Sequence, residues 1–243
     1  MPLTFEDAIN LQDSYQPTDK EVKRQLKTVL LAPIVGPTAV GKNHLMAILA
    51  EKYGYYQAGN VVSRELRQND PPNVHHRDES DLLKDIENGE VIQFAAFLGN
   101  RAIYATVLES YQLGQINTKD IYAHSIESFT EYGFGDVRPV GVVVTPNEWE
   151  PRLDKRFSNM DREQRASRLD EAAESIQWIL EGSPHIPRVV IIGEDEYRNE
   201  SIERVHAFVE KGLDVPSEQI HLDTAQQMLE RLPRFREKYL KKE

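Results

Sequence analysis

A glycine-rich turn between an apolar segment and a helical segment constrains this chain more than any other feature. The turn comprises Gly36, Pro37, Thr38, Ala39, Val40, Gly41, Lys42 and Asn43. Residues 28–35 are mostly apolar and partly β-branched, which predicts a buried strand, and residues 44–53 predict a helix ending at Gly54. In this context the spacing G-x-x-x-x-G-K predicts a phosphate site, because backbone amides, a helix N-terminus and Lys42 all face the anion.

The residue after the lysine departs from the motif. Asn43 stands where Ser or Thr normally supplies a hydroxyl to Mg²⁺. An amide oxygen can also ligate Mg²⁺, although it sits farther out, so Asn43 is the candidate ligand for a metal that enters with ATP. The turn therefore supports nucleotide binding more strongly than it supports phosphoryl transfer.

Composition excludes several classes of protein. The chain has 243 residues, of which 40% are hydrophobic, and it has no cysteine, so disulfides and thiolate metal sites are excluded. No apolar run reaches the roughly 20 residues that span a bilayer, and the N-terminus lacks a secretory pattern, so we expect a cytoplasmic protein. The net charge of −11 argues against nucleic acid as a partner. Nucleotides are the expected partners, and the oligomeric state is open.

Alternating apolar and amphipathic segments predict an α/β protein with a parallel central sheet. Further strands are expected at 55–62, 91–98, 102–106, 116–123, 137–145 and 187–193. Helices are expected at 18–26, 78–88, 107–113, 162–181, 201–211 and 223–232. Gly99 and Asn100 indicate a turn between two of the strands.

Two groups of arginines are spaced to hold anions. Arg64 and Arg67 follow Ser63, and guanidinium groups bind phosphate through two parallel hydrogen bonds. Arg152 and Arg156 lie four residues apart and would share a helix face. For Arg64 and Arg67 the alternative is a pair of solvated surface arginines.

Two further arginines, Arg165 and Arg168, lie near the start of the helix expected at 162–181. Arginines there oppose the helix dipole unless an anion is present. The alternative is a solvated helix start with Asp161 and Glu163 as partners.

An acidic residue that holds Mg²⁺ through water is expected at the end of a central strand. We find no carboxylate cleanly at the end of the strand expected at 116–123, which leaves Glu127 as the candidate. The alternative for Glu127 and His124 is an ordinary helix start.

Residues 28–211 resemble guanylate kinase through several segments in order. The phosphate turn comes first, then 63–67 resembles the family's T-T-R-x-x-R, and 86–100 resembles its I-x-x-G-x-F and G-N elements. Arg152-Leu153, Arg156 and Arg168-Leu169 follow at similar spacing. The resemblance implies a three-layer α/β/α P-loop fold with a monophosphate-binding subdomain at 62–107 and a lid at 150–168. Helical extensions are expected at 1–27 and 212–243.

By this resemblance the activity is transfer of a phosphoryl group from ATP to GMP or to a monophosphate of altered base, with Mg²⁺. Lys42 and the lid arginines Arg152, Arg156 and Arg168 would be catalytic, because the transition state spreads negative charge over phosphoryl oxygens. The implied acceptor contacts are Ser63, Arg64, Arg67, Gln93, Tyr104 and Thr106.

Departures from the family pattern keep a second function open. Gln93 falls where the family has a base-reading glutamate, and an amide offers one acceptor and one donor group where a carboxylate offers two acceptors. Carboxylates expected near 124–126 are missing. The alternative is a catalytically impaired guanylate-kinase-like module that binds nucleotides or proteins. The tRNA dimethylallyltransferases share the G-P-T-A-x-G-K turn, but no companion to their later motifs is found.

Overall fold

The computed structural model describes residues 2–68, 70–183, 185–194, 198–212 and 219–241. It divides into two compact units. Unit 1 comprises residues 1–31, 56–117 and 128–136, and unit 2 comprises residues 32–55, 118–127 and 137–243. Residues 213–218 and 242–243, which belong to the expected C-terminal extension, lie outside the described residues.

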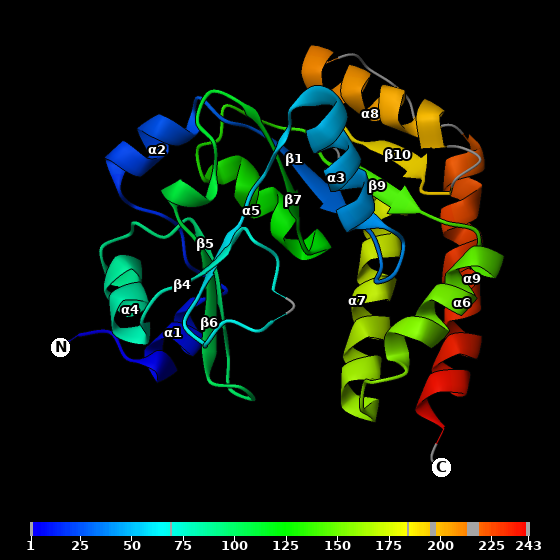
Figure 1. The fold of residues 1–243 in the computed structure, drawn as a ribbon, viewed down its shortest axis with the longest axis horizontal. Coiled ribbons are helices and arrows are strands. Elements are labelled where there is room, and N and C mark those ends of the chain that lie inside the picture. The colour runs from blue at the N-terminus through cyan, green and yellow to red at the C-terminus, as the bar shows by residue number, and fades with distance from the viewer. Residues whose placement is uncertain (1, 69, 184, 195–197, 213–218, 242–243) are drawn as a thin grey trace. The chain divides into compact units, whose positions relative to one another are not determined.

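The described helices are α1 (Phe5–Leu11), α2 (Lys20–Leu26), α3 (Lys42–Tyr53), α4 (Glu79–Glu87), α5 (Ile126–Glu131), α6 (Pro146–Phe157), α7 (Arg162–Glu181), α8 (Arg198–Lys211) and α9 (Gln219–Leu240), together with the short 3₁₀ helices η1 (Leu108–Ser110) and η2 (Ala123–Ser125) (Figure 1). The strands form two sheets.

The central sheet has the order β10 (Val189–Ile192), β9 (Val140–Val143), β1 (Leu30–Val35), β7 (Ile116–Asp120) and β2 (Tyr56–Gln57), and β8 (Asp136–Val137) also pairs with β1. Both β1 and β10 run parallel to β9. The expected α/β fold with a mostly parallel central sheet is confirmed.

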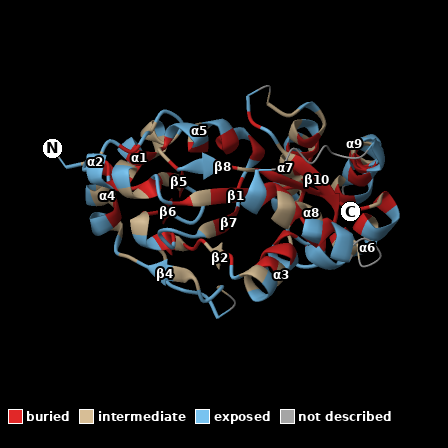
Figure 2. Cartoon of the chain, turned by 90° about the horizontal axis from the view of Figure 1, so that it is seen from above, coloured by how far each residue is buried: buried red, intermediate tan, exposed pale blue. Residues whose placement is uncertain are grey.

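Strands β1, β9 and β10 of this sheet are buried because their sequences are continuous, mostly apolar runs. All four residues of β9 and all four of β10 are buried, as parallel strands covered on both faces should be. Pro33 lies within β1, and the recorded register with β9 begins after it, at Ile34 opposite Val140. Figure 2 shows buried residues on the strands and exposed residues on the outward sides of the helices.

Two groups of helices flank the sheet in unit 2. In the first group α3 contacts α8, and α8 packs on β10. In the second group α9 lies alongside α7 and contacts α6, β9 and β10 (Figure 1). The helix expected at 223–232 is therefore longer at both ends and belongs to the core packing of unit 2.

A second sheet of order β4 (Val74–His76), β3 (Asn60–Val62), β6 (Ala102–Thr106) and β5 (Gln93–Phe97) lies in unit 1. The turn predicted at Gly99 and Asn100 joins β5 to β6, which pair in antiparallel register. Helix α1 packs on β5 and α4 packs on β6. The side chain of Gln12 accepts a 2.8 Å hydrogen bond from the backbone amide of Ala96, so it satisfies a donor on this edge strand.

Several expected elements are wrong in extent. The helix expected at 107–113 is only η1, and β4 is not expected at all. Helix α1 lies in the helical extension expected at 1–27, within which the only helix located by sequence is that at 18–26. The strand expected at 55–62 is interrupted between β2 and β3, and the one expected at 137–145 is interrupted at Arg138 and Pro139. Proline cannot donate to a ladder, which accounts for the second interruption. Residues 152–157 are the second half of α6, so Arg152 and Arg156 lie on a helix, as their spacing predicts.

Candidate functional site

The phosphate turn joins β1 to α3, as the sequence predicts. Ala39 and Gly41 have positive φ angles of 69° and 99°, so successive amides turn toward one side of the loop. A Cβ at Gly36 would lie 2.5 Å from the carbonyl oxygen of Val142, so no larger residue fits there. Gly41 is the N-cap of α3 and provides no side-chain cap, which leaves the first-turn amides available to an anion.

Lys42 is the first residue of α3 and is buried, with 9% of its surface exposed. Its ammonium donates a 2.5 Å hydrogen bond to the carbonyl oxygen of Gly36 and lies 3.3 Å from a carboxylate oxygen of Asp120. The side chain therefore folds over the phosphate loop, where it is held between two oxygen acceptors.

Asp120 corrects the expectation that β7 ends without a carboxylate. It is the last residue of the strand, which ends three residues earlier than expected, whereas Glu127 lies in the first turn of α5. Desolvation raises the pKa of Asp120 and the nearby ammonium of Lys42 opposes this shift. In the sequence, the apolar residue Ile121 follows Asp120, so the end of the strand at Asp120 could not be recognised.

Oxygen ligands for a metal that accompanies a nucleotide are available at the loop. Asn43 is exposed in the first turn of α3, and the Asp120 side chain is 48% exposed beside Lys42. A carboxylate and an amide oxygen, completed by water and phosphate, suit Mg²⁺. Within the described residues, no cluster of three or more His, Cys, Asp or Glu side chains forms an all-protein metal site.

A cavity of about 540 Å³ opens between Ala39 of the phosphate loop and residues 152–164, at the end of α6 and the start of α7. Helix α6 contributes Arg152 and Arg156, two of the three predicted lid arginines, to the cavity. Lys155 of the same helix is a third cation there. The lining residues are Ala39, Arg152, Lys155, Arg156, Asn159, Met160 and Gln164. The structure thus brings Arg152 and Arg156 to one face, as their spacing predicts.

The cations of this cavity are weakly compensated. Arg152 lies 3.4 Å from Glu148 one turn earlier, and Arg156 has no ion pair among the described residues. Arg168 does not line the cavity; it forms a 2.5 Å pair with Glu171. The Nε of the neighbouring Arg165 is buried and has no hydrogen-bond partner within the described part of the chain. Unpaired guanidinium groups of this kind attract anions.

A buried tryptophan connects α6 to the phosphate loop. The indole nitrogen of Trp149 donates a 2.9 Å hydrogen bond to the carbonyl oxygen of Thr38, and its ring packs edge-to-face on Phe235 of α9. The position of Arg152, one turn after Trp149, is therefore set by the loop on one side and by α9 on the other.

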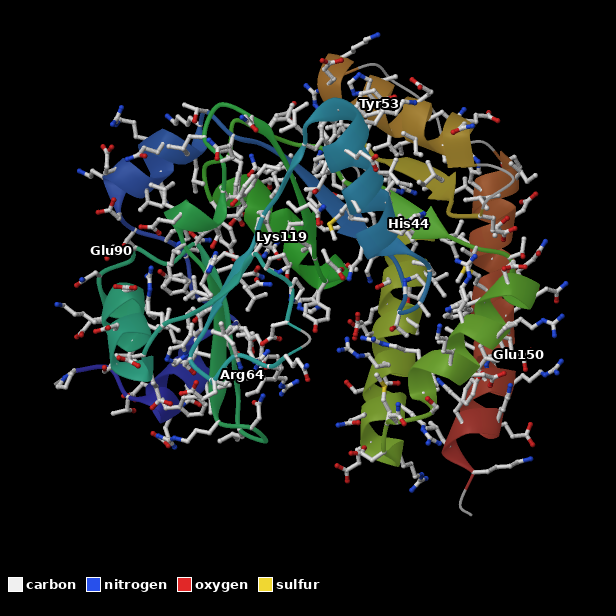
Figure 3. All side chains as sticks on the ribbon, in the orientation of Figure 1. His44, Tyr53, Arg64, Glu90, Lys119 and Glu150 are labelled. Carbon is white, nitrogen blue, oxygen red and sulfur yellow. The ribbon has the colours of Figure 1, made fainter. Side chains whose placement is uncertain are left out.

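The predicted acceptor residues lie in unit 1, on β5, β6 and the segment after β3. Arg64 is labelled in Figure 3. Its Nε donates a 2.9 Å hydrogen bond to the hydroxyl of Tyr104, which also accepts one of 3.2 Å from Asn100. The guanidinium also binds Asp70 through two hydrogen bonds of 2.7 and 2.8 Å. This pairing, which lowers the pKa of Asp70, was not expected.

The remaining acceptor candidates differ in how available they are. Ser63 accepts a 2.9 Å hydrogen bond from the amide of Ile103, so its hydroxyl already has one partner. The side chain of Arg67 is exposed, and Gln93 of β5 is half-buried opposite Thr106 of β6. Thr106 is only 2% exposed. Gln93, Arg64 and Tyr104 thus belong to one sheet and its adjoining loop.

Comparisons with known proteins add a likeness of fold. The chain is similar to guanylate kinase. The crystal structure of that enzyme from Anaplasma phagocytophilum matches with 19% identity, over 85% of this chain and 95% of that chain, at a TM-score of 0.45. No protein-family model and no curated protein matches the sequence. At this identity and TM-score the likeness concerns the fold alone.

Sequence reasoning missed three charged residues of the two candidate sites. Lys155 lies beside Arg156 in the sequence, so its charge could have been counted with the arginines. Asp120 required the end of β7 to be known, and Asp70 required the fold of the loop after β3. No described helix is long and apolar enough to cross a membrane.

Proposed function

We propose that this chain binds ATP with Mg²⁺ at the phosphate loop and transfers its terminal phosphoryl group to a nucleoside monophosphate. The observation that carries the proposal is the pairing of Lys42 with Asp120 at the start of α3 and the end of β7. A loop with left-handed backbone positions, a lysine and a strand-end carboxylate together suit a phosphate chain and its metal.

On the donor side, the loop amides and Lys42 hold the β- and γ-phosphates. Asp120 and Asn43 are the oxygen donors that would hold the metal, which neutralises charge on these phosphates when bound. Gly36 and Asp120 hold the Lys42 ammonium beside the loop, so its position is fixed before a phosphate arrives.

On the acceptor side, Arg64 and Tyr104 bind the phosphate of a nucleoside monophosphate, with Ser63, Arg67 and Thr106 as further contacts. Gln93 faces the base. Its amide presents one acceptor and one donor group, so it does not require the two donors that guanine offers to a carboxylate. The acceptor is therefore GMP or a monophosphate with a different base.

In the transfer step a phosphate oxygen of the monophosphate attacks the γ-phosphorus of ATP. The bond to the β–γ bridging oxygen breaks, and ADP leaves with that electron pair. Arg152 and Arg156, which line the loop-side cavity, stabilise the charge on the transferring oxygens, and Arg168 supports them. Closure of this segment would exclude water and prevent hydrolysis.

A catalytically impaired module that binds nucleotides or proteins is the second candidate. Asn43 in place of a hydroxyl residue, Gln93 in place of glutamate, and the pairing of Arg64 with Asp70 favour it. The intact Lys42 and the uncompensated Arg156 favour the enzyme.

Turnover decides between them. The purified protein is mixed with ATP, Mg²⁺ and each of GMP, AMP, CMP and UMP, and ADP formation is measured beside an Asp120→Asn variant. The enzyme proposal predicts ADP that depends on one monophosphate and falls by about 100-fold in the variant. Binding of ATP without ADP formation on any acceptor supports the module.

A further inference from the structure

The anion-binding groups around Arg64 are already occupied by an anion of the protein itself. Nη1 and Nη2 of Arg64 donate hydrogen bonds of 2.7 and 2.8 Å to the two different carboxylate oxygens of Asp70. The backbone amide of Arg67 donates a third, of 2.7 Å, to the same carboxylate. Both side chains are largely buried, at 14% and 15% exposure.

These donors have the geometry of a phosphate site. A guanidinium fork and a backbone amide that converge on one anion are what a phosphate monoester needs. The rest of the guanidinium is held in place, because Nε donates to the Tyr104 hydroxyl and Nη1 also donates to the carbonyl oxygen of Glu65 at 2.8 Å. Four of the five N–H groups thus have acceptors. A phosphate can reach the fork only if Asp70 leaves it.

We propose that Asp70 is an internal competitor that restricts this site to doubly charged phosphate monoesters. The inference rests on the proposed function, because it takes Arg64 as the group that binds the acceptor phosphate. A ligand that displaces Asp70 must replace the two hydrogen bonds from Arg64 and the one from the Arg67 amide, and it must attract these donors more strongly than a singly charged carboxylate does. A dianion with three terminal oxygens can do this, whereas a phosphodiester with one charge and two free oxygens cannot.

The charge of the ligand therefore sets its affinity. Arg64 holds the pKa of Asp70 well below its ordinary value, so the competitor stays charged at any pH used for assay. A phosphate monoester gains its second charge near pH 6. Affinity of the wild-type protein for a monophosphate should then rise between pH 5 and 7, and this rise should be smaller once Asp70 is neutral.

The test compares the wild-type protein with Asp70→Asn by titration calorimetry. The probes are GMP, AMP, CMP, UMP and inorganic phosphate, with the 5′-methyl ester of each monophosphate as the singly charged partner. We expect Asp70→Asn to bind the monophosphate about tenfold more tightly and to lose most of the preference for it over its methyl ester. Asp81→Asn is the matched control, because Asp81 is an exposed aspartate of α4 in the same unit and should leave both values unchanged.

Circular dichroism and the thermal midpoint establish that each variant is folded, and Asp70→Ser replaces Asp70→Asn if the asparagine variant is not. Equal affinities of the wild-type protein and the variant overturn this inference and leave the proposed function standing. Weaker binding by the variant also overturns it, since Asp70 would then position Arg64. If no probe binds to either protein, both proposals fail.

Discussion

The indole nitrogen of Trp149 lies 2.9 Å from the carbonyl oxygen of Thr38, so α6 is hydrogen-bonded to the backbone of the phosphate loop. Trp149 is fully buried, and a buried donor must find an acceptor. The contact links a loop that would hold phosphates to the helix that carries Arg152 and Arg156.

Replacing Trp149 by Phe should loosen this link. The carbonyl of Thr38 would lose its buried donor, which costs about 1–3 kcal/mol in the free energy of unfolding. We expect a lower unfolding free energy together with weaker ATP binding. Chemical denaturation and nucleotide titration measure both quantities. The control is Trp178→Phe, which removes a half-buried indole from α7, at a position distant in sequence from the phosphate loop. If this variant weakened ATP binding equally, the hydrogen bond between Trp149 and Thr38 would not be the cause of the effect.

Helix α9 should be needed for the stability of unit 2. Phe235 is fully buried and packs edge-to-face on Trp149 with ring centroids 5.3 Å apart. Phe235→Ala should lower the unfolding free energy by about 3–5 kcal/mol, because it leaves a cavity beneath α6. Arg234→Ala, at an exposed position one residue away, should change stability little. Urea denaturation of both variants checks this, and similar losses would contradict the packing argument.

Lys42 should be needed for nucleotide affinity. Lys42→Ala removes the only side chain that folds over the loop to both Gly36 and Asp120 among the described residues, and we expect the dissociation constant for ATP to rise at least about tenfold. Lys52→Ala provides the comparison, because Lys52 lies at the other end of α3 and pairs with Glu203 at the surface. An unchanged ATP affinity in Lys42→Ala, measured by calorimetry, would remove the basis of the phosphate site.

Arg156 should affect turnover much more than stability. Its side chain is exposed, lines the loop-side cavity and has no ion pair within the part of the chain that is described. Arg156→Ala should lower kcat by about 100-fold, as expected when a preorganised donor to a transition state is lost, while the thermal midpoint stays near that of the wild-type protein. Rescue by Arg156→Lys should be only partial, because lysine lacks the planar fork.

Because of Lys119, the free energy of unfolding should change with pH in the alkaline range. Burial in β7 lowers its pKa to about 8, although Asp120 opposes the shift (Figure 3). Between pH 8 and the ordinary lysine value near 10.5, the unfolded chain binds a proton that the folded chain has lost. The contribution of Lys119 to the free energy of unfolding therefore rises with pH between 8 and 10.5, and it is lowest below pH 8.

Lys119→Met tests this by removing the titration. The variant should unfold at higher denaturant concentration than the wild-type protein at pH 7, and the difference should shrink as the pH approaches 10. Lys84→Met, at an exposed position of α4, should show no such pH-dependent difference. A gap between Lys119→Met and wild type that stays constant with pH would show that the charge of Lys119 is not the cause.

Local chemistry was enough to predict much of this molecule. The turn from Gly36 to Lys42, the buried strands at 140–143 and 189–192, and the start of α7 at its Asp161 cap follow from neighbouring residues, because positive φ, continuous apolar runs and capping hydrogen bonds are short-range properties. The spacing of Arg152 and Arg156 likewise required only the helix period.

Tertiary structure decided which charges meet. Asp120 faces Lys42, although 78 positions separate them in the chain, because β7 ends beside the start of α3. Asp70 faces Arg64 because the loop after β3 folds back on itself. Phe235 reaches Trp149 because α9 packs against α7 and α6. The pairs made by Asp120 and by Phe235 depend on long-range packing of strands and helices, and the pair made by Asp70 depends on how one loop folds, so no helix or strand pattern encodes them. The sequence alone therefore predicted candidate phosphate-binding groups, and the fold determined which partners hold their side chains.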